Sequence, residues 1–220
     1  RQMCIRDRFK EVLLRLQNEE HAANINLVTP THYTPSIAAA LGELRDSRVL
    51  TIPVVYNTSS FDSLEALSLM RGKVDVYLAD FKYASALEAG KLSHAPRYPE
   101  IALAAIEEMI AQVPVWEEDD EGLLLKGVIV RHLVLPGRVE ESKRALATLH
   151  DRFGSSVRLS IMSQYTPLAS GLERYGLAGR VTEEEYEEVL DYADSLGVED
   201  YFWQQGDAAR ESFVPEFNGE

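Results

Sequence analysis

The pattern of apolar residues predicts short strands that alternate with helices along the whole chain. Five runs rich in β-branched residues have the length and composition of buried strands: Ile25–Val28, Ile52–Tyr56, Val74–Leu78, Val128–Leu135 and Val157–Met162. A sixth and weaker candidate strand is Tyr201–Trp203. Apolar residues recur at helical spacing near Phe9 and Tyr186, and further helices are expected over Ser36–Arg45, Ser63–Met70, Glu100–Gln112 and Glu140–Arg152.

Two local features refine this pattern. Thr182 followed by Glu185 forms a capping box, which predicts the start of the helix that contains Tyr186. The stretch Val113–Leu124 contains the acidic run Glu117–Glu121 and is expected to be a solvated loop or an edge hairpin.

Apolar strands that alternate with helices indicate an α/β fold with a parallel sheet covered by helices. Both a doubly wound sheet and a TIM-type barrel, whole or partial, satisfy this pattern. A complete barrel typically needs about 250 residues, and no glycine-rich phosphate turn of the nucleotide-binding doubly wound kind follows any strand. We therefore predict a partial (β/α)6 barrel that lacks its first βα unit. Its five main strands should be parallel and in sequential order, with an exposed edge near Ile25.

The charge of the chain is unevenly distributed, which excludes some partners. Acidic residues number 36 and basic residues 22, for a net charge of −14. Thirteen of the acidic residues but only one basic residue lie after residue 180. A nearly neutral body with an acidic end offers no footprint for nucleic acid or an anionic membrane. No run is long enough to cross a bilayer, no signal-peptide pattern opens the chain, and the single cysteine, Cys4, favours a cytoplasmic protein.

The sequence also predicts how the chain is divided. Residues 1–8 (RQMCIRDR) have no helical or strand periodicity, and we expect them to be a non-native leader, which leaves Cys4 without a role. Residues 9–205 are expected to form the barrel and residues 206–220 a C-terminal tail.

Polar residues follow each predicted strand at its carboxyl end, which is where parallel α/β folds bind their ligands. Polar loops are common, but polar clusters at all five strand ends together indicate a ligand site. The clusters are Thr29–Tyr33, Asn57–Ser60, Asp80–Tyr83, the pair Arg131 and His132 ahead of Pro136-Gly137, and Ser163–Pro167.

The third strand is the most informative. Alternation over Val76–Lys82 places the even-numbered side chains on one face and the odd-numbered ones on the other. The even-numbered face begins with the apolar Val76 and Leu78 and ends with the charged Asp80 and Lys82. This is expected of a barrel interior that opens onto a ligand at the carboxyl ends of its strands. A structural ion pair between Asp80 and Lys82 would produce the same pattern, and both interpretations stay open here.

Arg131 and His132 are adjacent in the fourth strand, so they should point to opposite faces. An arginine in an apolar strand needs an anion, either a side chain or a ligand. A histidine in such a strand is more often a hydrogen-bonded core residue than a catalyst. His32 follows a strand end and is either a site residue or a solvent-exposed turn residue. No histidines and carboxylates have metal-ligand spacing, so no metal ligand is predicted in this chain.

Five phrases spread over the chain resemble, in order and at matching strand ends, radical S-adenosylmethionine proteins similar to pyruvate formate-lyase activating enzyme. The resemblance extends from about Phe9 to about Gln204. The phrases are Asn24-Ile-Asn-Leu-Val-Thr-Pro-Thr-His-Tyr33, Val54-Val-Tyr-Asn-Thr-Ser59, Asp75-Val-Tyr-Leu-Ala-Asp-Phe-Lys-Tyr83, Val130-Arg-His-Leu-Val-Leu-Pro-Gly137 and Ser160-Ile-Met-Ser-Gln-Tyr-Thr-Pro167.

This resemblance implies a partial (β/α)6 barrel of the radical SAM kind, with two cofactors. The family holds a [4Fe–4S] cluster through three cysteines in a C-x₃-C-x₂-C loop after the first strand. The cluster cleaves S-adenosylmethionine reductively to a 5′-deoxyadenosyl radical. This chain has no such motif, and one cysteine cannot hold the cluster. We expect that the first strand and its loop have been cut off, rather than that the chain is a degenerate homologue.

The resemblance also implies roles for individual residues. Asp80-Phe81-Lys82 matches an Asp-Leu-Lys in which the acid binds the ribose and the lysine the methionine carboxylate. In the segment from Asn57 to Phe61, Asn57 replaces an aspartate near the ribose, and Thr29–His32 replaces a Gly-Gly-Glu segment that binds the methionine amine. The residues expected to bind the cofactor are Thr29, Thr31, His32, Asn57, Ser59, Asp80, Lys82, Arg131, His132, Gln164 and Tyr165. Catalytic residues are not identified.

Two classes of function follow from these observations. The first is the core of a radical SAM enzyme, with activation of a glycyl-radical enzyme as a candidate reaction and a polypeptide as a candidate substrate beside the small-molecule cofactor. The 220 residues alone should be inactive, with weak affinity for S-adenosylmethionine. The alternative is a barrel that binds a small metabolite or a protein partner without radical chemistry.

Overall fold

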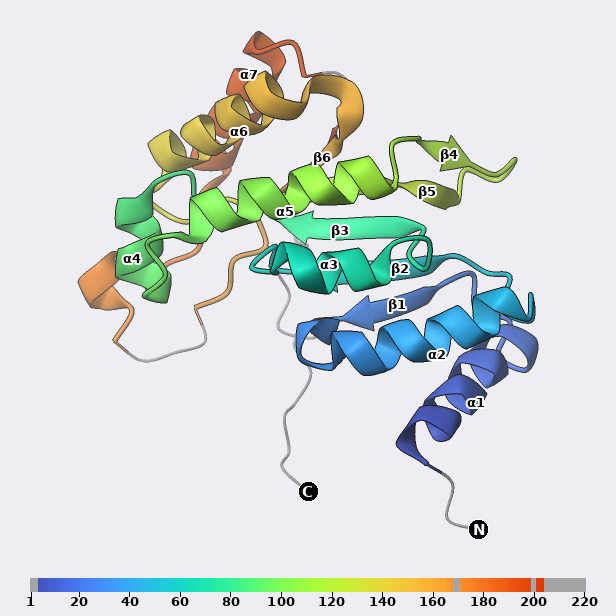
Figure 1. Cartoon of the computed structure of the whole chain (residues 1–220). Helices are drawn as coiled ribbons and strands as arrows, with labels where there is room; N and C mark the ends of the chain where they lie inside the picture. Colours follow the sequence, from blue (N-terminus) through green and yellow to red (C-terminus); the bar gives the residue numbers. More distant parts are fainter. Residues whose placement is uncertain (1–3, 168–170, 199–200, 204–220) are drawn as a thin grey trace. The chain divides into compact units, whose positions relative to one another are not determined.

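The computed structural model describes residues 4–167, 171–198 and 201–203, in which strands and helices alternate (Figure 1). The strands are β1 (Ile25–Val28), β2 (Val54–Thr58), β3 (Val76–Asp80), β4 (Glu117–Glu118), β5 (Leu124–Leu133), β6 (Arg158–Met162) and β7 (Phe202–Trp203). The helices are α1 (Ile5–Asn18), α2 (Thr34–Asp46), α3 (Leu64–Met70), α4 (Ala86–Ser93), α5 (Tyr98–Gln112), α6 (Val139–Phe153) and α7 (Glu183–Ser195), with 3₁₀ turns η1 (Pro30–Tyr33), η2 (Gly154–Ser156) and η3 (Glu173–Tyr175).

The strands follow one another in the order β1-β2-β3-β5-β6-β7, and β4 pairs with β5 outside this order. The pairs β1/β2, β2/β3 and β6/β7 are parallel, whereas the short β4 is antiparallel to β5. The sheet is not closed: β1 stands at one end of the strand order and β7 at the other. This confirms the predicted parallel, sequential α/β architecture, including the edge position of the strand that begins at Ile25. Of the two expectations for Val113–Leu124, a solvated loop or an edge hairpin, the structure has a short hairpin, formed with β5 inside the strand order.

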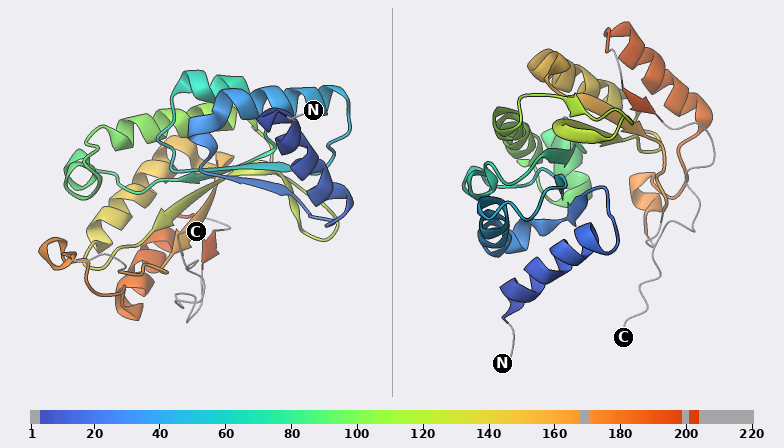
Figure 2. Two further views of the ribbon diagram at one scale, coloured as in Figure 1. Left: turned by 90° about the horizontal axis from the view of Figure 1, so that it is seen from below. Right: turned by 90° about the vertical axis from the view of Figure 1, so that its right-hand side faces the viewer.

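The chain divides into two compact units, one made of residues 1–80 and 100–130 and the other of residues 81–99 and 131–220. In the first unit, α2, α3 and α5 lie on one face of the strands (Figures 1 and 2). Tyr77 illustrates this packing, because its ring is fully buried and its hydroxyl donates to Gln112 on α5 at 2.7 Å. The core of this unit includes Leu41, Val54, Tyr56, Leu67, Met70, Ile106 and Met109.

In the second unit, α6 packs against α7, and both present apolar residues to the core (Figure 1). Tyr186 on α7 donates its hydroxyl to the carbonyl of Ile161 on β6 at 2.7 Å. The capping box is present as predicted: the Thr182 hydroxyl accepts from Glu185 N–H, and the Glu185 carboxylate accepts from Thr182 N–H. The other acidic side chains of Glu183–Glu188 are mostly exposed, as expected of a solvated helix face.

The structure corrects several predicted boundaries. Helix α1 begins at Ile5 with Cys4 as its N-cap, so residues 5–8 are helical although their sequence shows no clear periodicity. Strand β5 begins at Leu124 instead of Val128. Helix α4 was not predicted, because its eight residues are too few to show a helical repeat clearly. The proposed tail at 206–220 and residues 204–205 of the proposed barrel lie outside the described residues.

In the part of the chain that the structure describes, no helix combines the length and the apolar character that a bilayer span requires.

Candidate functional site at the carboxyl ends of the strands

The first unit brings Asn57 and Asp80 to the same face of the sheet. Asn57 is in register with Leu78 on β3, and residues in register on parallel strands share a face. Asp80 lies two residues beyond Leu78 and therefore shares that face too. Both polar side chains are half-buried. Tyr56 and Tyr77, which occupy the opposite face, are fully buried, and their ring centroids are 5.8 Å apart. Two predicted site residues thus lie on neighbouring strand ends, on the face away from the helices.

Two residues beside Asn57 have a strained backbone. Thr29 follows β1 with φ at 51° and Ser60 follows β2 with φ at 62°, in the left-handed region that glycine favours. Such strain concentrates at functional loops. Thr29 is tied to β2 through its N–H, which donates to the carbonyl of Asn57 at 2.8 Å. The Ser60 hydroxyl is fully buried and has no hydrogen-bond partner among the described residues, which is uncommon for a buried polar group.

A buried carboxylate that sequence reasoning missed, Asp62, connects the two loops. Its side chain is 2% exposed and accepts hydrogen bonds from the hydroxyls of Thr31 at 2.8 Å and Tyr56 at 3.3 Å, and also from the hydroxyl of Thr58. Burial raises the pKa of the Tyr56 hydroxyl, and the neighbouring charge of Asp62 adds to this. Thr31, a predicted site residue, is therefore held by Asp62 through a contact that spans 31 positions of the chain.

The second unit contains the residues that follow β3. Phe81 is fully buried and stacks on Tyr98 at the start of α5, with ring centroids 6.5 Å apart. Lys82 is exposed, and its backbone N–H donates to the Tyr98 hydroxyl at 3.0 Å. The predicted alternation is thus correct at Phe81, which faces a helix as Tyr77 does on the same side of the strand.

The ring of His132 reaches α6, and His132 lines a small pocket of the second unit together with Lys82, another predicted site residue. Its ring is 2% exposed, with Nδ1 at 2.8 Å from the carbonyl of Phe81 and Nε2 at 2.9 Å from the Ser142 hydroxyl on α6. Nδ1–H must donate to the carbonyl, so in the neutral ring Nε2 accepts from the hydroxyl. Burial lowers the pKa of His132 and favours this neutral form. Both nitrogens are used inside the protein, as expected of a hydrogen-bonded core histidine, which was one of the two interpretations of His132. Arg131, its neighbour, is half-buried.

The other predicted residues occupy strand-end loops. Thr29 and His32 are exposed and Ser59 is half-buried, all in the first unit. In the second unit, Gln164 is exposed, and the half-buried Tyr165 donates its hydroxyl to the carbonyl of Leu177 at 2.9 Å. Tyr165 therefore has a structural hydrogen bond of its own.

The polar side chains of this chain suit one of the two cofactors that the resemblance implies and not the other. Among residues 4–167, 171–198 and 201–203, no three His, Cys, Asp or Glu side chains gather as metal ligands, and Cys4 is an exposed N-cap. This chain therefore does not fit a [4Fe–4S] cluster. It does carry groups suited to S-adenosylmethionine: a half-buried carboxylate at Asp80, an amide at Asn57, an exposed ammonium at Lys82 and the orphan hydroxyl of Ser60.

Comparison with known proteins places the fold. No protein-family model matches the sequence. An uncharacterized protein of Methanocaldococcus jannaschii is 28% identical over 199 residues, covering 89% of this chain and 54% of that protein. The chain thus spans about half the length of that curated relative.

Several solved structures have a similar fold, and one of them is a radical SAM methyltransferase. A domain of a pyruvate-formate lyase-activating enzyme from Bacteroides vulgatus matches with a TM-score of 0.57 and 10% identity, over 83% of this chain and 98% of that one. Streptococcus suis SuiB bound to S-adenosylmethionine matches with a TM-score of 0.60 and 12% identity, over 94% of this chain and 43% of that one. A radical SAM methyltransferase from Sphaerobacter thermophilus matches with a TM-score of 0.59 and 12% identity, over 88% of this chain and 55% of that one. The chain therefore has a radical SAM-like fold, a partial TIM barrel.

Proposed function

We propose that this chain is the S-adenosylmethionine-binding barrel of a radical SAM enzyme. The observation that carries the proposal is the shared face of Asn57 and Asp80 at neighbouring strand ends, with Lys82 two residues further on, in a radical SAM-like fold. Ligands of parallel α/β folds bind at this end of the strands. One protein with this fold, SuiB, has been crystallised with S-adenosylmethionine, which supports the choice of ligand.

Each of the three residues has a role suited to its chemistry. The Asp80 carboxylate accepts hydrogen bonds from the two ribose hydroxyls, since a vicinal diol offers two adjacent donors. The Lys82 ammonium pairs with the methionine carboxylate in a charge-assisted hydrogen bond. Asn57 bonds the ribose through its amide and contributes no charge, so its share of the binding energy is smaller.

When bound, S-adenosylmethionine would supply a 5′-deoxyadenosyl radical, because one electron from a reductant breaks its C5′–S bond and releases methionine. The part proposed for this chain is to bind and orient the cofactor, and no step through an iron–sulfur cluster is assigned to these 220 residues, which hold one cysteine. The substrate class proposed for the whole enzyme is a polypeptide, including a glycyl-radical enzyme. Support comes from a similar structure, SuiB, which binds a precursor peptide, and from the similar activating-enzyme domain.

The single cysteine favours a second candidate, a barrel that binds a small metabolite without radical chemistry. The two functions differ in their ligand. A cofactor-binding barrel should prefer S-adenosylmethionine and S-adenosylhomocysteine over adenosine, because only the first two carry the carboxylate that Lys82 is proposed to bind.

Titration of the 220-residue chain with isotopically labelled S-adenosylmethionine in equilibrium dialysis tests the proposal. Lys82→Ala should weaken binding roughly tenfold to a hundredfold, as expected for a lost charge-assisted hydrogen bond, and Asn57→Ala by about fivefold. Lys126→Ala removes the same charge from an exposed lysine on the β4–β5 hairpin and should leave the affinity unchanged. Equal affinities of the wild type and Lys82→Ala would rule out the carboxylate-binding role, and adenosine binding as tightly as the cofactor would favour the second candidate.

A further inference from the structure

The backbone on both sides of Lys82 is held by groups from other elements. Before it, Phe81 N–H donates to the carbonyl of Arg131 at 2.8 Å, and the Phe81 carbonyl accepts from His132. At Lys82 itself, the N–H is bonded to Tyr98. The segment from Phe81 to Lys82 is therefore restrained by β5 and by the start of α5, while the Lys82 side chain stays exposed.

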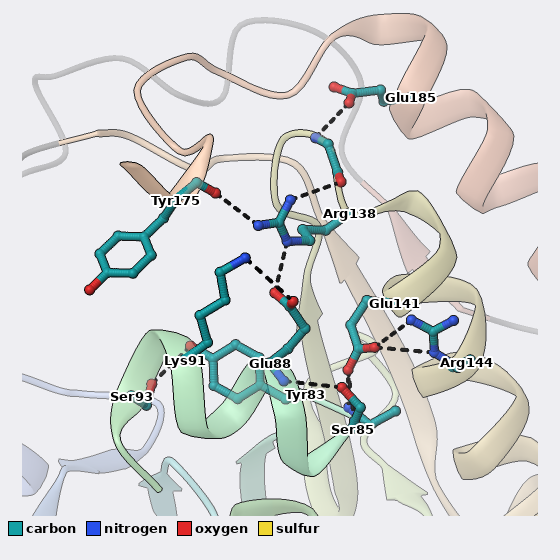
Figure 3. A network of polar contacts seen from close by, with 12 residues as sticks. Tyr83, Ser85, Glu88, Lys91, Ser93, Arg138, Glu141, Arg144, Tyr175 and Glu185 are labelled. Carbon is teal, nitrogen blue, oxygen red and sulfur yellow. Dashed lines mark hydrogen bonds and ion pairs between the residues drawn. The ribbon is translucent and has the colours of Figure 1, made fainter. Parts of the chain in front are cut away.

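Beyond Lys82, one carboxylate restrains the chain. Glu141, in the first turn of α6, accepts the N–H of Ala84 at 2.8 Å and the N–H of Ser85 at 2.7 Å on the same oxygen, Oε1. Its other oxygen, Oε2, accepts from Arg144 at 2.8 Å, and Figure 3 shows Glu141 between Arg144 and Ser85. The Glu141 side chain is 5% exposed. Because Ser85 is the N-cap of α4, this carboxylate fixes the point where the loop enters the helix.

Glu141 is well suited to this task because it stays ionised. Burial by itself would raise the pKa of Glu141. The hydrogen bonds from Arg144 and from the backbone of Ser85 and Ala84 outweigh burial, so the net pKa lies below its ordinary value. A charged acceptor binds backbone N–H groups more strongly than a neutral one does.

Helix α4 is held from a second side by Arg138, which precedes α6. The Arg138 guanidinium donates to Glu88 on α4 at 2.8 Å and to the carbonyl of Tyr175 at 2.8 Å (Figure 3). The Ser85 hydroxyl accepts from Glu88 N–H within α4 itself. The helix that follows the Lys82 segment is therefore anchored in place, and movement of the segment must break the contacts at Glu141 or at His132.

We propose that Glu141 is a positioning residue for Lys82: it fixes the Ala84–Ser85 backbone, together with the His132–Ser142 pair at Phe81, so that the Lys82 ammonium is pre-organised for the carboxylate of its ligand. This inference rests on the proposed function and deepens it. A segment ordered before binding loses less conformational entropy on binding, so its contacts contribute more to affinity. Glu141 acts through the backbone and does not touch the ligand.

A double-mutant cycle on the full chain tests the inference, with labelled S-adenosylmethionine as the probe. Glu141→Ala should weaken binding about tenfold, the equivalent of one hydrogen bond of ordinary strength. Glu141→Gln keeps a neutral carbonyl oxygen for both N–H groups, so it should weaken binding less than Glu141→Ala does, by about threefold. In the Lys82→Ala background, Glu141→Ala should change the affinity by less than about twofold, since the group it positions is absent.

Amide hydrogen exchange gives a second readout without ligand. Glu141→Ala should speed exchange at Ala84 and Ser85, Glu141→Gln should speed it less, and the amides of α7 should be unchanged in both. Should Glu141→Ala fail to fold, Glu141→Asp replaces it, because the shorter side chain cannot reach both N–H groups and keeps the charge.

The outcomes separate the two proposals. Wild-type binding that Lys82→Ala weakens but Glu141→Ala leaves unchanged overturns this inference alone. Equal losses from Glu141→Ala with and without Lys82 also overturn it, because they indicate a general structural role. A wild-type chain that does not bind the cofactor overturns the proposed function and the positioning role together.

Discussion

Asp62 in the first unit and Glu141 in the second are both buried carboxylates that hold a strand-end loop, yet their hydrogen-bond donors differ. Asp62 accepts from three side-chain hydroxyls, those of Thr31, Tyr56 and Thr58. Glu141 accepts from two backbone N–H groups and from Arg144. No Lys, Arg or His of the described residues pairs with Asp62.

This difference in donors should decide how each loop responds to change. A hydroxyl can rotate about its C–O bond and find another acceptor, whereas a backbone N–H is fixed in direction by the chain. Loss of Asp62 leaves groups that can reorient: the Tyr56 hydroxyl already lies 3.3 Å from that of Thr34. Loss of Glu141 leaves the N–H groups of Ala84 and Ser85 without an acceptor in a partly buried loop. The loop at Glu141 should therefore be the more sensitive of the two.

The largest effect is expected from Glu141→Ala. It should lower the free energy of unfolding by about 3 kcal/mol, because two charge-assisted hydrogen bonds to backbone donors are lost. Chemical denaturation followed by circular dichroism measures this. Glu140→Ala is the matched control, since the neighbouring Glu140 side chain is 74% exposed, and its effect should stay within about 0.5 kcal/mol. A loss below about 1 kcal/mol for Glu141→Ala would contradict the importance given to the backbone donors.

Asp62→Ala should cost less, about 2 kcal/mol, because the freed hydroxyls can bond elsewhere while some buried polar groups stay unsatisfied. The same denaturation experiment applies, with Asp46→Ala at an exposed aspartate as the control. A destabilisation larger than that of Glu141→Ala would reverse the comparison and show that the hydroxyl cluster is the more rigid of the two.

Lowering the pH should weaken the second unit through His132 and Glu141. The pKa of His132 is lowered by burial, so below its ordinary value of 6.5 the unfolded chain binds a proton that the folded chain resists. The stabilisation is present above pH 6.5 and is lost as the pH falls below it, by at most about 1.4 kcal/mol per pH unit. Glu141, with its pKa below the ordinary 4.5, adds a further loss once the pH falls below that value.

Denaturation at a series of pH values from 8 to 5 checks the histidine contribution. His132→Asn keeps a donor near the Phe81 carbonyl but cannot titrate, so its stability should depend less on pH in this range. His32→Asn, at an exposed histidine, should keep the wild-type dependence because His132 is intact. An unchanged slope in His132→Asn would show that another group is responsible.

The smallest effect is expected at Tyr56→Phe, which removes one donor of Asp62. Both hydrogen bonds of the Tyr56 hydroxyl are long, at 3.3 Å, so the loss of stability should be about 0.5 kcal/mol. A thermal melt compares this variant with the wild type. A loss above about 2 kcal/mol would mean that the hydroxyl is essential to the cluster and cannot be replaced by its neighbours.

Part of the candidate site was predictable because its signals are local. The alternation along β3 correctly placed Phe81 on the side of Tyr77, toward a helix, since strand side chains alternate whatever surrounds them. Helix α4 is too short to show a helical repeat, but it has a local signal at its start: Ser85 followed three positions later by Glu88 is the pattern of an N-terminal cap. Asp62 had no such signal, because an acidic residue after a strand is equally common in a solvated loop.

The sequence by itself determined the alternation of strands and helices, their parallel order and the capping box at Thr182, because each depends on periodicities and contacts within a few residues. Only the tertiary structure decided that His132 faces the helices and that Glu141 bonds Ala84, 57 positions away in the chain. A hydrogen bond of that span leaves no local pattern, since it depends on where the folded elements bring two distant segments together.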